Sequence, residues 1–398
     1  MSGHFQPIAV KYKKGSLIVV EGKPSADRFF IIKEGRVRVT HELDSIISEA
    51  NIAGPGEMFG VVSAMASRGY IESALALTDV VLLAVDRSLI SNSIPVAVNI
   101  IRQFSQRLRR MNETLSRRLM KSAASEDPSY LMQIGRYYEK AGKNSQALYA
   151  YQQYLAYCPN TENTNSITEK IKKIEPRVKV ARPVYPADTM IQKYPKDCLL
   201  FAECESGHNL FIIQEGSVKI TKIADNQEII LAVLKKGDIF GEMAMLEDKP
   251  RAATAEVYED CTLLSVNQSN FTNLINEQPE MVIRLTTLMA ERIWFRYRQL
   301  ANTSIINPLG RLYDALLTQL ETNRIDLNTA NPYLCNFGFT ELVAMAGLPE
   351  AKTKELYNKV SSSGKITMNN NKVYITNVEA VVKEAEYYRR ARKTENDD

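Results

Sequence analysis

One short segment of the 398-residue chain combines residue types suited to binding a sugar phosphate. Residues 240–254 read FGEMAMLEDKPRAAT. Gly241 permits a tight turn into a short helix whose N-terminal amides point at an anion. Arg251 supplies a charge-assisted, bidentate contact to phosphate oxygens. Glu242 can accept a hydrogen bond from a ribose hydroxyl, which a bare phosphate or sulfate does not need. The small residues after the arginine let backbone N–H groups approach the phosphate: Ala252 and Ala253.

The same pattern occurs twice in the chain at a constant offset. FIIKEGRVRVT at 30–40 returns as FIIQEGSVKIT at 211–221, and the FG pair at 59–60 returns at 240–241. Such matched spacing indicates one domain present in two copies.

The first copy of the phosphate-binding segment, 59–74, has lost the expected chemistry. Val61 replaces the glutamate, and Glu72 sits where the arginine belongs. A carboxylate facing a phosphate is repulsive. We therefore expect this copy to bind no sugar phosphate and to act as a scaffold or a protein-binding domain, although Arg68 leaves a different anionic ligand open.

Each copy is predicted to form an antiparallel β-roll followed by an amphipathic helix. Short β-branched runs alternate with glycine-bearing turns. Apolar residues then recur at steps of three and four in 101–119 and again in 285–300. These stripes fit packing on the parent roll and pairing between helices equally well.

Residues 240–254 resemble the phosphate-binding cassette of cyclic-nucleotide-binding domains, which catabolite-activator (Crp/Fnr)-type regulators share with cyclic-nucleotide-dependent kinases. The resemblance implies a cyclic nucleotide as effector, with Glu242 on the ribose and Arg251 on the phosphate. Ala252 favours cAMP over cGMP, because guanine-preferring members often carry Thr there. The alternative is an empty roll in which Glu242 and Arg251 pair with each other. The implied ligand contacts are Phe240, Gly241, Glu242, Met243, Ala244, Arg251, Ala252, Ala253 and Thr254, with Arg296 and Tyr297 at the positions that contact adenine in the activator.

Between the two copies, 128–159 resembles a single tetratricopeptide repeat, with a third helix predicted over 166–174. Gly135 and Ala147 are small enough for two antiparallel helices to pack closely. One repeat cannot bury a solenoid core, so we expect a spacer docked on a neighbouring helix. Tyrosines expected to be exposed keep a protein-binding role open: Tyr149, Tyr154 and Tyr157.

Residues 305–385 resemble the winged helix-turn-helix of the activator family. Gly347 stands at the predicted tight turn, a helix is predicted over 350–362, and a wing hairpin over 364–376. Double-stranded DNA is the expected partner. The base-reading positions carry Glu350, Ala351 and Glu355, and 339–398 holds ten basic and nine acidic residues, so a winged helix kept for protein contacts is the alternative. The expected DNA contacts are Thr340, Lys352, Lys354, Lys359, Lys365 and Lys372.

The composition narrows the classes of function. A hydrophobic content of 45%, a charged content of 24% and a net charge of +4 are ordinary for soluble protein and neither require nor exclude a polyanionic partner. The chain has no secretory leader and no apolar run long enough for a membrane span, so we expect a cytoplasmic protein without a membrane partner. Five cysteines without a C-x-x-C pair and three scattered histidines argue against disulfides, zinc and metal catalysis. No nucleophile–base pair or Walker loop appears, which disfavours an enzyme.

The sequence therefore predicts an α+β multidomain protein with two antiparallel β-rolls, an α-hairpin insert, long connecting helices and a C-terminal winged helix-turn-helix. The expected domains are a degenerate roll with its long helix at 1–122, the hairpin with its capping helix at 123–176, a linker at 177–190, the ligand-binding roll with its long helix at 191–304, the winged helix at 305–385 and a charged tail at 386–398.

The expected function is transcription regulation in response to a cyclic nucleotide bound only in the second roll, with no metal or other cofactor. In the expected mechanism, the ligand repacks the helix over 281–304 and reorients the C-terminal module. The alternative is a cyclic-nucleotide-sensing adaptor that binds protein at the hairpin or the first roll. Since a palindromic operator needs two helix-turn-helix units and one chain supplies one, we expect a homodimer over pairing of the two long helices within a chain.

Overall fold

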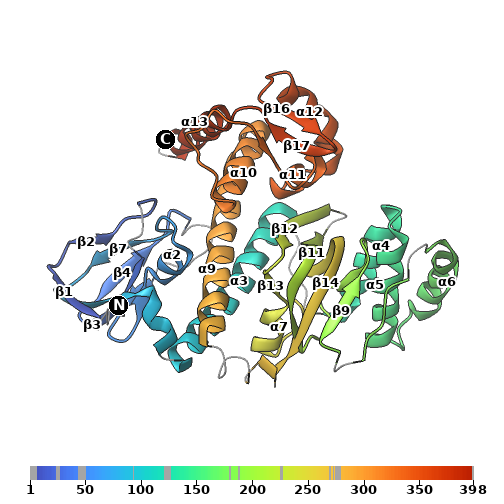
Figure 1. Ribbon diagram of the computed structural model, residues 1–398, viewed down its shortest axis with the longest axis horizontal. Coiled ribbons are helices and arrows are strands. Elements are labelled where there is room, and N and C mark those ends of the chain that lie inside the picture. Colours follow the sequence, from blue (N-terminus) through green and yellow to red (C-terminus); the bar gives the residue numbers. More distant parts are fainter. Residues whose placement is uncertain are drawn as a thin grey trace. The chain divides into compact units, whose positions relative to one another are not determined.

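Figure 1 shows the protein as a computed structural model. The structure describes residues 7–396, apart from 24–26, 44–50, 93, 121–126, 179–180, 187–188, 225–226, 269, 272 and 274–278. The chain divides into two compact units. Unit 1 comprises 1–114 and 267–297, and unit 2 comprises 115–266 and 298–398.

Unit 1 contains the first β-roll. Its two four-stranded antiparallel sheets have the strand orders β1-β8-β3-β6 and β2-β7-β4-β5, and they enclose a core that includes Ile32, Val37 and Leu82. The predicted strands are present, because the β-branched and aromatic side chains of β3 and β8 alternate toward this core. The strands are β1 Ile8–Tyr12, β2 Leu17–Val19, β3 Arg28–Glu34, β4 Val37–Thr40, β5 Asn51–Ala53, β6 Met58–Phe59, β7 Ser73–Ala76 and β8 Val80–Asp86.

Three helical elements accompany the first roll. The short helix α2 (Val61–Ala66) follows β6, and η1 (Arg87–Asn92) leads into the long helix α3 (Ile94–Met120). A second long helix, α9 (Pro279–Asn302), belongs to unit 1 as far as Tyr297 and to unit 2 from Arg298 onward. None of the described helices is long and apolar enough to cross a membrane.

The second roll lies in unit 2 and repeats the strand sequence of the first. Its sheet has the order β10-β14-β11-β12, with β13 paired to β11 and β9 paired to β14. The long strands β11 and β14 take part in most of these pairings (Figure 1). The elements are β9 Ile191–Tyr194, β10 Leu199–Phe201, β11 Asn209–Ala224, β12 Gln227–Lys235, β13 Ile239–Phe240, α7 Glu242–Glu247 and β14 Thr254–Asn267.

The segment before the second roll forms the predicted helical hairpin and third helix. The elements are η2 Pro128–Tyr130, α4 Leu131–Lys140, α5 Asn144–Tyr157, α6 Thr164–Ile174 and η3 Glu175–Arg177. The expectation that this hairpin docks on a helix is wrong, because its buried side chains share one hydrophobic cluster with Leu199 and Ala202 of the second roll. For the same reason Tyr149 and Tyr154 are buried, and of the three tyrosines expected at the surface only Tyr157 is exposed.

The C-terminal residues form a helical module with a small three-stranded sheet, ordered β15-β17-β16. The tight turn between β16 and β17 places Asn370 and Asn371 at φ +49° and +61°, as a two-residue hairpin loop requires. Ile230 of β12 joins the core of this module. Its elements are α10 Pro308–Thr322, β15 Tyr333–Leu334, α11 Phe339–Met345, η4 Glu350–Lys352, α12 Thr353–Ser361, β16 Ile366–Asn369, β17 Lys372–Ile375 and α13 Val378–Asn396.

The charged tail expected from residue 386 is helical instead as far as Asn396, as part of α13. The Tyr388 ring stacks with Tyr313 of α10, and Arg389 donates a hydrogen bond to the buried carboxylate of Asp314. These contacts give the charged segment a partner face on which a helix is stable.

Close packing between α4 and α5 depends on Gly135. A Cβ at Gly135 would lie 2.5 Å from two ring carbons of Tyr151, which is itself fully buried. We expect Gly135→Ala to lower the free energy of unfolding by about 1–3 kcal/mol, the usual cost of overpacking. In a Tyr151→Leu background the ring is absent, so the same substitution should be neutral or stabilising, because Ala has the better helix propensity. Thermal melts of the four proteins test this, and equal effects of Gly135→Ala in both backgrounds would contradict it.

Candidate functional site

The cassette of the second roll encloses a buried arginine. β13 ends at Phe240, Gly241 caps the N-terminus of α7 with a left-handed φ of +79°, and the chain returns into β14 past Arg251. Glu242 is 1% exposed and Arg251 is 6% exposed. The Arg251 Nη1 donates to the carbonyl oxygen of Gly241 at 2.7 Å, and its guanidinium carbon lies 4.1 Å from the ring centroid of Phe201. The predicted contacts of Glu242 with a ribose and of Arg251 with a phosphate stay predictions.

Arg251 keeps its charge despite this burial. Burial lowers its pKa to about 10, while the carboxylates of Glu205 and Glu242 oppose that shift. A pKa of about 10 leaves the guanidinium protonated at neutral pH. Its Nε atom is buried and has no hydrogen-bond acceptor among the described residues. A buried cation with an unused donor is suited to accept an anion, because leaving such a donor unsatisfied is costly.

A loop that the sequence analysis did not single out covers Arg251. This loop, 202–208, joins β10 to β11. The Arg251 amide donates to the Glu205 carbonyl at 2.7 Å, and the Cys204 amide donates to the Arg251 carbonyl at 3.0 Å. A Cβ at Gly207 would lie 2.1 Å from the Arg251 Nε, so any larger residue there would displace the guanidinium. The sequence signal was slight: a single glycine between two predicted strands, which marks a close backbone approach as often as a turn.

The other predicted ligand residues of the cassette differ in exposure. Met243 and Ala252 are half-buried, and Ala244, Ala253 and Thr254 are buried. The Thr254 hydroxyl accepts a hydrogen bond from the Glu203 amide at 3.0 Å, so it fastens the covering loop.

Arg296 and Tyr297, which were expected beside a purine, belong to unit 1 with the first roll. The Tyr297 hydroxyl donates to the carboxylate of Glu21, and the neighbouring Trp294 donates its indole N–H to the Gly69 carbonyl at 3.1 Å. Arg296 is buried, and burial together with Arg292 lowers its pKa to about 9. Contact of either residue with a base stays a prediction.

The cassette of the first roll has the same backbone as that of the second, which corrects one sequence assignment. Helices α2 and α7 begin after Gly60 at φ +76° and Gly241 at φ +79°. Tyr70 exchanges backbone hydrogen bonds with Gly22 and Lys23 just as Arg251 does with Cys204 and Glu205. Tyr70 therefore occupies the position of Arg251. The assignment of Glu72 to that position is wrong, because Glu72 lies two residues further along the chain.

Glu72 nevertheless places a carboxylate at the start of α2. Its buried carboxylate accepts a hydrogen bond from the Gly60 amide and lies 3.6 Å from Nε2 of His41, which in turn is 2.9 Å from an Arg107 nitrogen of α3. Burial alone would raise the pKa of Glu72, but His41, Arg107 and the Gly60 amide hold it below its ordinary value. The first roll therefore supplies a carboxylate of its own at the start of α2.

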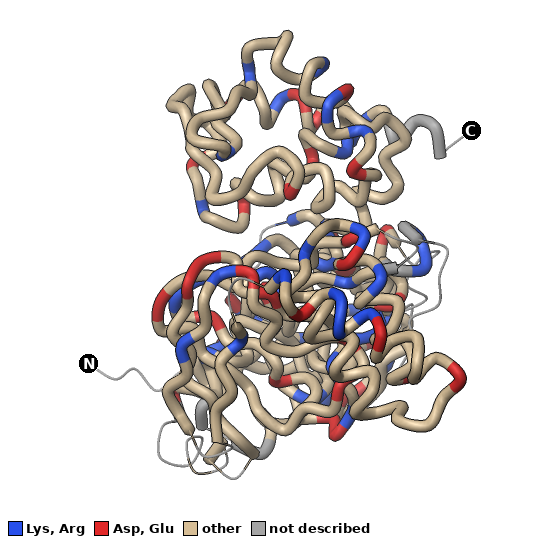
Figure 2. The backbone as a smooth tube through the Cα atoms, turned by 90° about the vertical axis from the view of Figure 1, so that its right-hand side faces the viewer, with Lys and Arg blue, Asp and Glu red and all other residues tan. Residues whose placement is uncertain are grey.

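The predicted DNA contacts lie on the C-terminal module, where both signs of charge occur (Figure 2). Thr340, Lys352 and Lys354 are exposed. Lys359 pairs with Glu355 at 2.6 Å, and Lys365 pairs with Glu384. Lys372 is half-buried at the start of β17. Within the described residues, no group of three or more His, Cys, Asp or Glu side chains is placed to hold a metal ion.

Comparison with known proteins supports the assignment of the two rolls. Residues 9–93 and 191–278 match the family described as cyclic nucleotide-binding domain. A protein of Pasteurella multocida (strain Pm70), the cAMP-activated global transcriptional regulator CRP, is 30% identical over 129 residues, which are 32% of this chain and 62% of that relative. The chain thus spans less than two thirds of the length of the curated relatives that it matches.

Among solved structures, a CooA mutant from Carboxydothermus hydrogenoformans is 18% identical to this chain, with a TM-score of 0.42. The match covers 49% of this chain and 87% of the CooA chain. The c-di-GMP responsive global regulator CLP of Xanthomonas campestris is 16% identical to this chain, with a TM-score of 0.41. The match covers 46% of this chain and 92% of the CLP chain.

The paired state of Glu72 predicts how the stability of unit 1 depends on pH. Because the folded-state pKa lies below the ordinary value of 4.5, the carboxylate stabilises the fold above pH 4.5, and this contribution is lost as pH falls through the folded-state pKa. We expect Glu72→Gln to cost about 3 kcal/mol at pH 7, the effect of breaking a buried ion pair, and progressively less below pH 4.5.

Urea unfolding followed by the fluorescence of Trp294, the single tryptophan, measures this in unit 1. Glu57→Gln is the matched control, since Glu57 is an exposed carboxylate in the same roll. A cost that does not change between pH 7 and pH 4 would contradict the assignment.

Proposed function

We propose that this protein is a cyclic-nucleotide-responsive transcription regulator that binds one cAMP per chain in its second roll and DNA through residues 305–385. The observation that carries the proposal is Arg251, a buried guanidinium whose Nε–H has no acceptor among the described residues. A cyclic phosphate diester brings a single negative charge and two free oxygens, which match one guanidinium in charge and geometry. Glu242, buried at the first turn of α7, is the proposed acceptor for the ribose 2′-hydroxyl.

The same reasoning assigns the first roll to a role other than nucleotide binding. Tyr70 replaces the arginine, Val61 replaces the glutamate, and the Glu72 carboxylate already accepts from the Gly60 amide. A phosphate at this place would have to displace Glu72, and Tyr70 stands where the second roll has Arg251. We therefore propose a single nucleotide site per chain.

The arrangement of the C-terminal module supports DNA as the partner. α11 and α12 are joined by a turn in which Gly347 has φ +62°, and the hairpin β16–β17 follows. This order and spacing fit a winged helix-turn-helix, whose second helix enters the major groove. The exposed Thr340, Lys352 and Lys354 are the proposed contacts to the phosphate backbone. Since each chain supplies one such module, two chains are proposed to bind a palindromic site.

Isothermal titration of cAMP into the full chain should give one site. Arg251→Lys keeps the charge but loses the planar fork, and we expect at least tenfold weaker binding, because hydrogen bonds to charged groups contribute about 1.5–3 kcal/mol. Lys249→Gln, which alters an exposed cation two residues away, is the matched control and should bind as the wild type does. Titration with cGMP tests the purine preference. No heat and no thermal stabilisation with either nucleotide would contradict the proposal and favour a protein-binding adaptor.

DNA binding should weaken as salt rises, with a slope set by the number of phosphate contacts. For a Lys352→Ala/Lys354→Ala variant, we expect the slope of log K against log salt to fall by about 1.8 in magnitude, since each contact contributes about 0.9. Fluorescence anisotropy on selected genomic fragments, with cAMP present, measures the slope. Lys236→Ala on the second roll is the control for loss of a surface cation. An unchanged slope in the double variant would remove these lysines from the interface.

A further inference from the structure

The second helix of the hairpin contacts the wall of the candidate nucleotide site directly. The Tyr149 hydroxyl of α5 donates to the Glu205 carboxylate at 2.9 Å, and the Tyr157 hydroxyl accepts from the Ser206 amide at 3.1 Å. Both partners lie in the loop 202–208, which covers Arg251. The loop 202–208 thus lies between the hairpin and the Arg251 guanidinium, in contact with both.

Apolar packing keeps α5 in this place. The buried side chains of the hairpin form one cluster with Leu199, Ala202 and Cys204 of the second roll. Two of these three residues border or belong to the covering loop. A movement of the loop therefore changes the packing of the hairpin, because closely packed interiors have few voids to absorb a shift.

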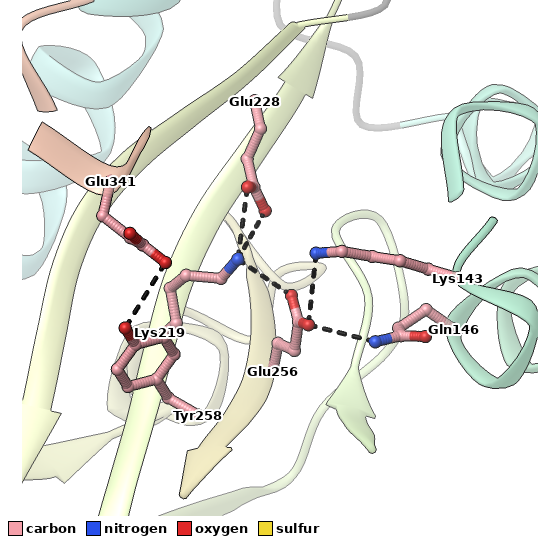
Figure 3. Close-up of polar contacts among 7 residues, drawn as sticks. All are labelled: Lys143, Gln146, Lys219, Glu228, Glu256, Tyr258 and Glu341. Atoms are coloured by element: carbon pink, nitrogen blue, oxygen red, sulfur yellow. Dashed lines mark hydrogen bonds and ion pairs between the residues drawn. The ribbon is translucent and has the colours of Figure 1, made fainter. Parts of the chain in front are cut away.

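The other end of α5 contacts a buried carboxylate of the second roll, Glu256. Figure 3 shows Lys219 of β11 between two carboxylates, 3.0 Å from Glu228 and 3.1 Å from Glu256. Lys143 and Gln146 reach Glu256 from the hairpin at 3.4 Å and 3.0 Å. Burial opposes ionisation of Glu256, yet Lys219 and Lys143 hold its pKa below its ordinary value. The N-terminal end of α5 is therefore held on the buried Glu256 carboxylate by one ion pair and one hydrogen bond.

We propose that α5 is a positioning element of the nucleotide site: Tyr149 and Tyr157 hold the loop 202–208 against Arg251, so the hairpin sets the nucleotide affinity. This inference rests on the proposed function of the second roll and adds the hairpin as its regulator. By thermodynamic reciprocity, whatever binds or moves the hairpin changes the nucleotide affinity, and the nucleotide changes the hairpin by the same free energy. Tyr149 and Tyr157 act through the loop and need not touch the nucleotide.

Glu205 gives the coupling a signature in pH. Burial raises the pKa of Glu205 to about 7. Contributions that lower the pKa, and only partly offset burial, come from the Ala202 amide, Tyr149, Arg182 and Arg251. The charged or titratable groups that face it are therefore Tyr149 of α5, Arg182 of the linker and Arg251 of the cassette, with Tyr157 bound to the next residue of its loop.

The sign of the pH effect follows from the charge of the ligand. An anion that neutralises Arg251 removes a contribution that lowers the Glu205 pKa, so the pKa rises when nucleotide binds. Binding is then coupled to proton uptake, and the affinity should fall as pH rises through about 7.

The experiment is calorimetric titration of cAMP into the full chain from pH 5.5 to 9, with Tyr→Phe variants along α5. Tyr149→Phe removes a hydrogen bond that lowers the Glu205 pKa, so the fall in affinity should move to higher pH. Tyr149→Phe/Tyr157→Phe releases the loop and should bind about fivefold to tenfold more weakly at pH 5.5, where Glu205 is protonated in every protein, since each hydrogen bond contributes about 0.5–1.5 kcal/mol.

Tyr154→Phe is the matched control. Its hydroxyl lies 2.7 Å from the Thr161 hydroxyl, away from the loop 202–208, so its pH profile and affinity should equal those of the wild type. Melting curves verify that each variant is folded. If the wild type binds cAMP and both tyrosine variants keep its affinity and its pH profile, the positioning role is wrong while the nucleotide site stands. If the wild type itself does not bind, the proposed function fails and this inference fails with it.

Discussion

The second roll depends on one constraint: the guanidinium of Arg251 must be buried and charged at the same time. Desolvation works against the charge, and the pKa of about 10 records that cost. The surrounding structure offsets the cost of desolvation, although Nε has no hydrogen-bond acceptor among the described residues. The Phe201 ring lies under the guanidinium, the Gly241 carbonyl accepts one N–H, and Gly207 leaves room for the group to lie flat against the covering loop. The result is a preorganised cation, for which an incoming anion does not have to order a flexible side chain.

The two rolls have the same cassette backbone but place opposite charges beside it. Both have a left-handed glycine before a six-residue helix and the same backbone pairing behind the cassette. In the first roll the charge that faces the helix start is negative and permanent, because Glu72 is covalently part of the chain and is held by His41 and Arg107. The two cassettes thus share a backbone but hold opposite charges near the helix start, a carboxylate in the first roll and a guanidinium in the second.

Much of this could be predicted from the sequence, because the deciding patterns are local. The repeat, the strands of both rolls, the hairpin helices and the order of elements after Asn307 follow from periodicity and turn residues that tertiary contacts reinforce. One prediction is wrong because it considers the charge of a residue and not its alignment with the other copy of the domain. Glu72 was placed two residues away from its true position because its charge suggested a replacement for arginine. Tyr149 and Tyr154 were expected at the surface, since a tyrosine gives no sequence signal for a partner that is remote in the chain.

Gly207 and Glu205 could not be found in this way at all. Neither belongs to a motif, and their importance arises from strand β10 bringing their loop over Arg251. A loop that supplies backbone atoms and one buried carboxylate leaves no spacing rule in the sequence. The pKa of Glu205 is set by burial under the hairpin, which is a property of packing between segments more than fifty residues apart in the chain.

Helix α9 takes part in both compact units. Up to Tyr297 its side chains contact the first roll, where Trp294 and Tyr297 bind Gly69 and Glu21. From Arg298 its contacts change: Gln299 donates to the carbonyls of Ile230 in β12 and Met345 in α11, and Asn302 donates to Asp314 of α10. Helix α9 therefore contributes side chains to both compact units, with the change between Tyr297 and Arg298.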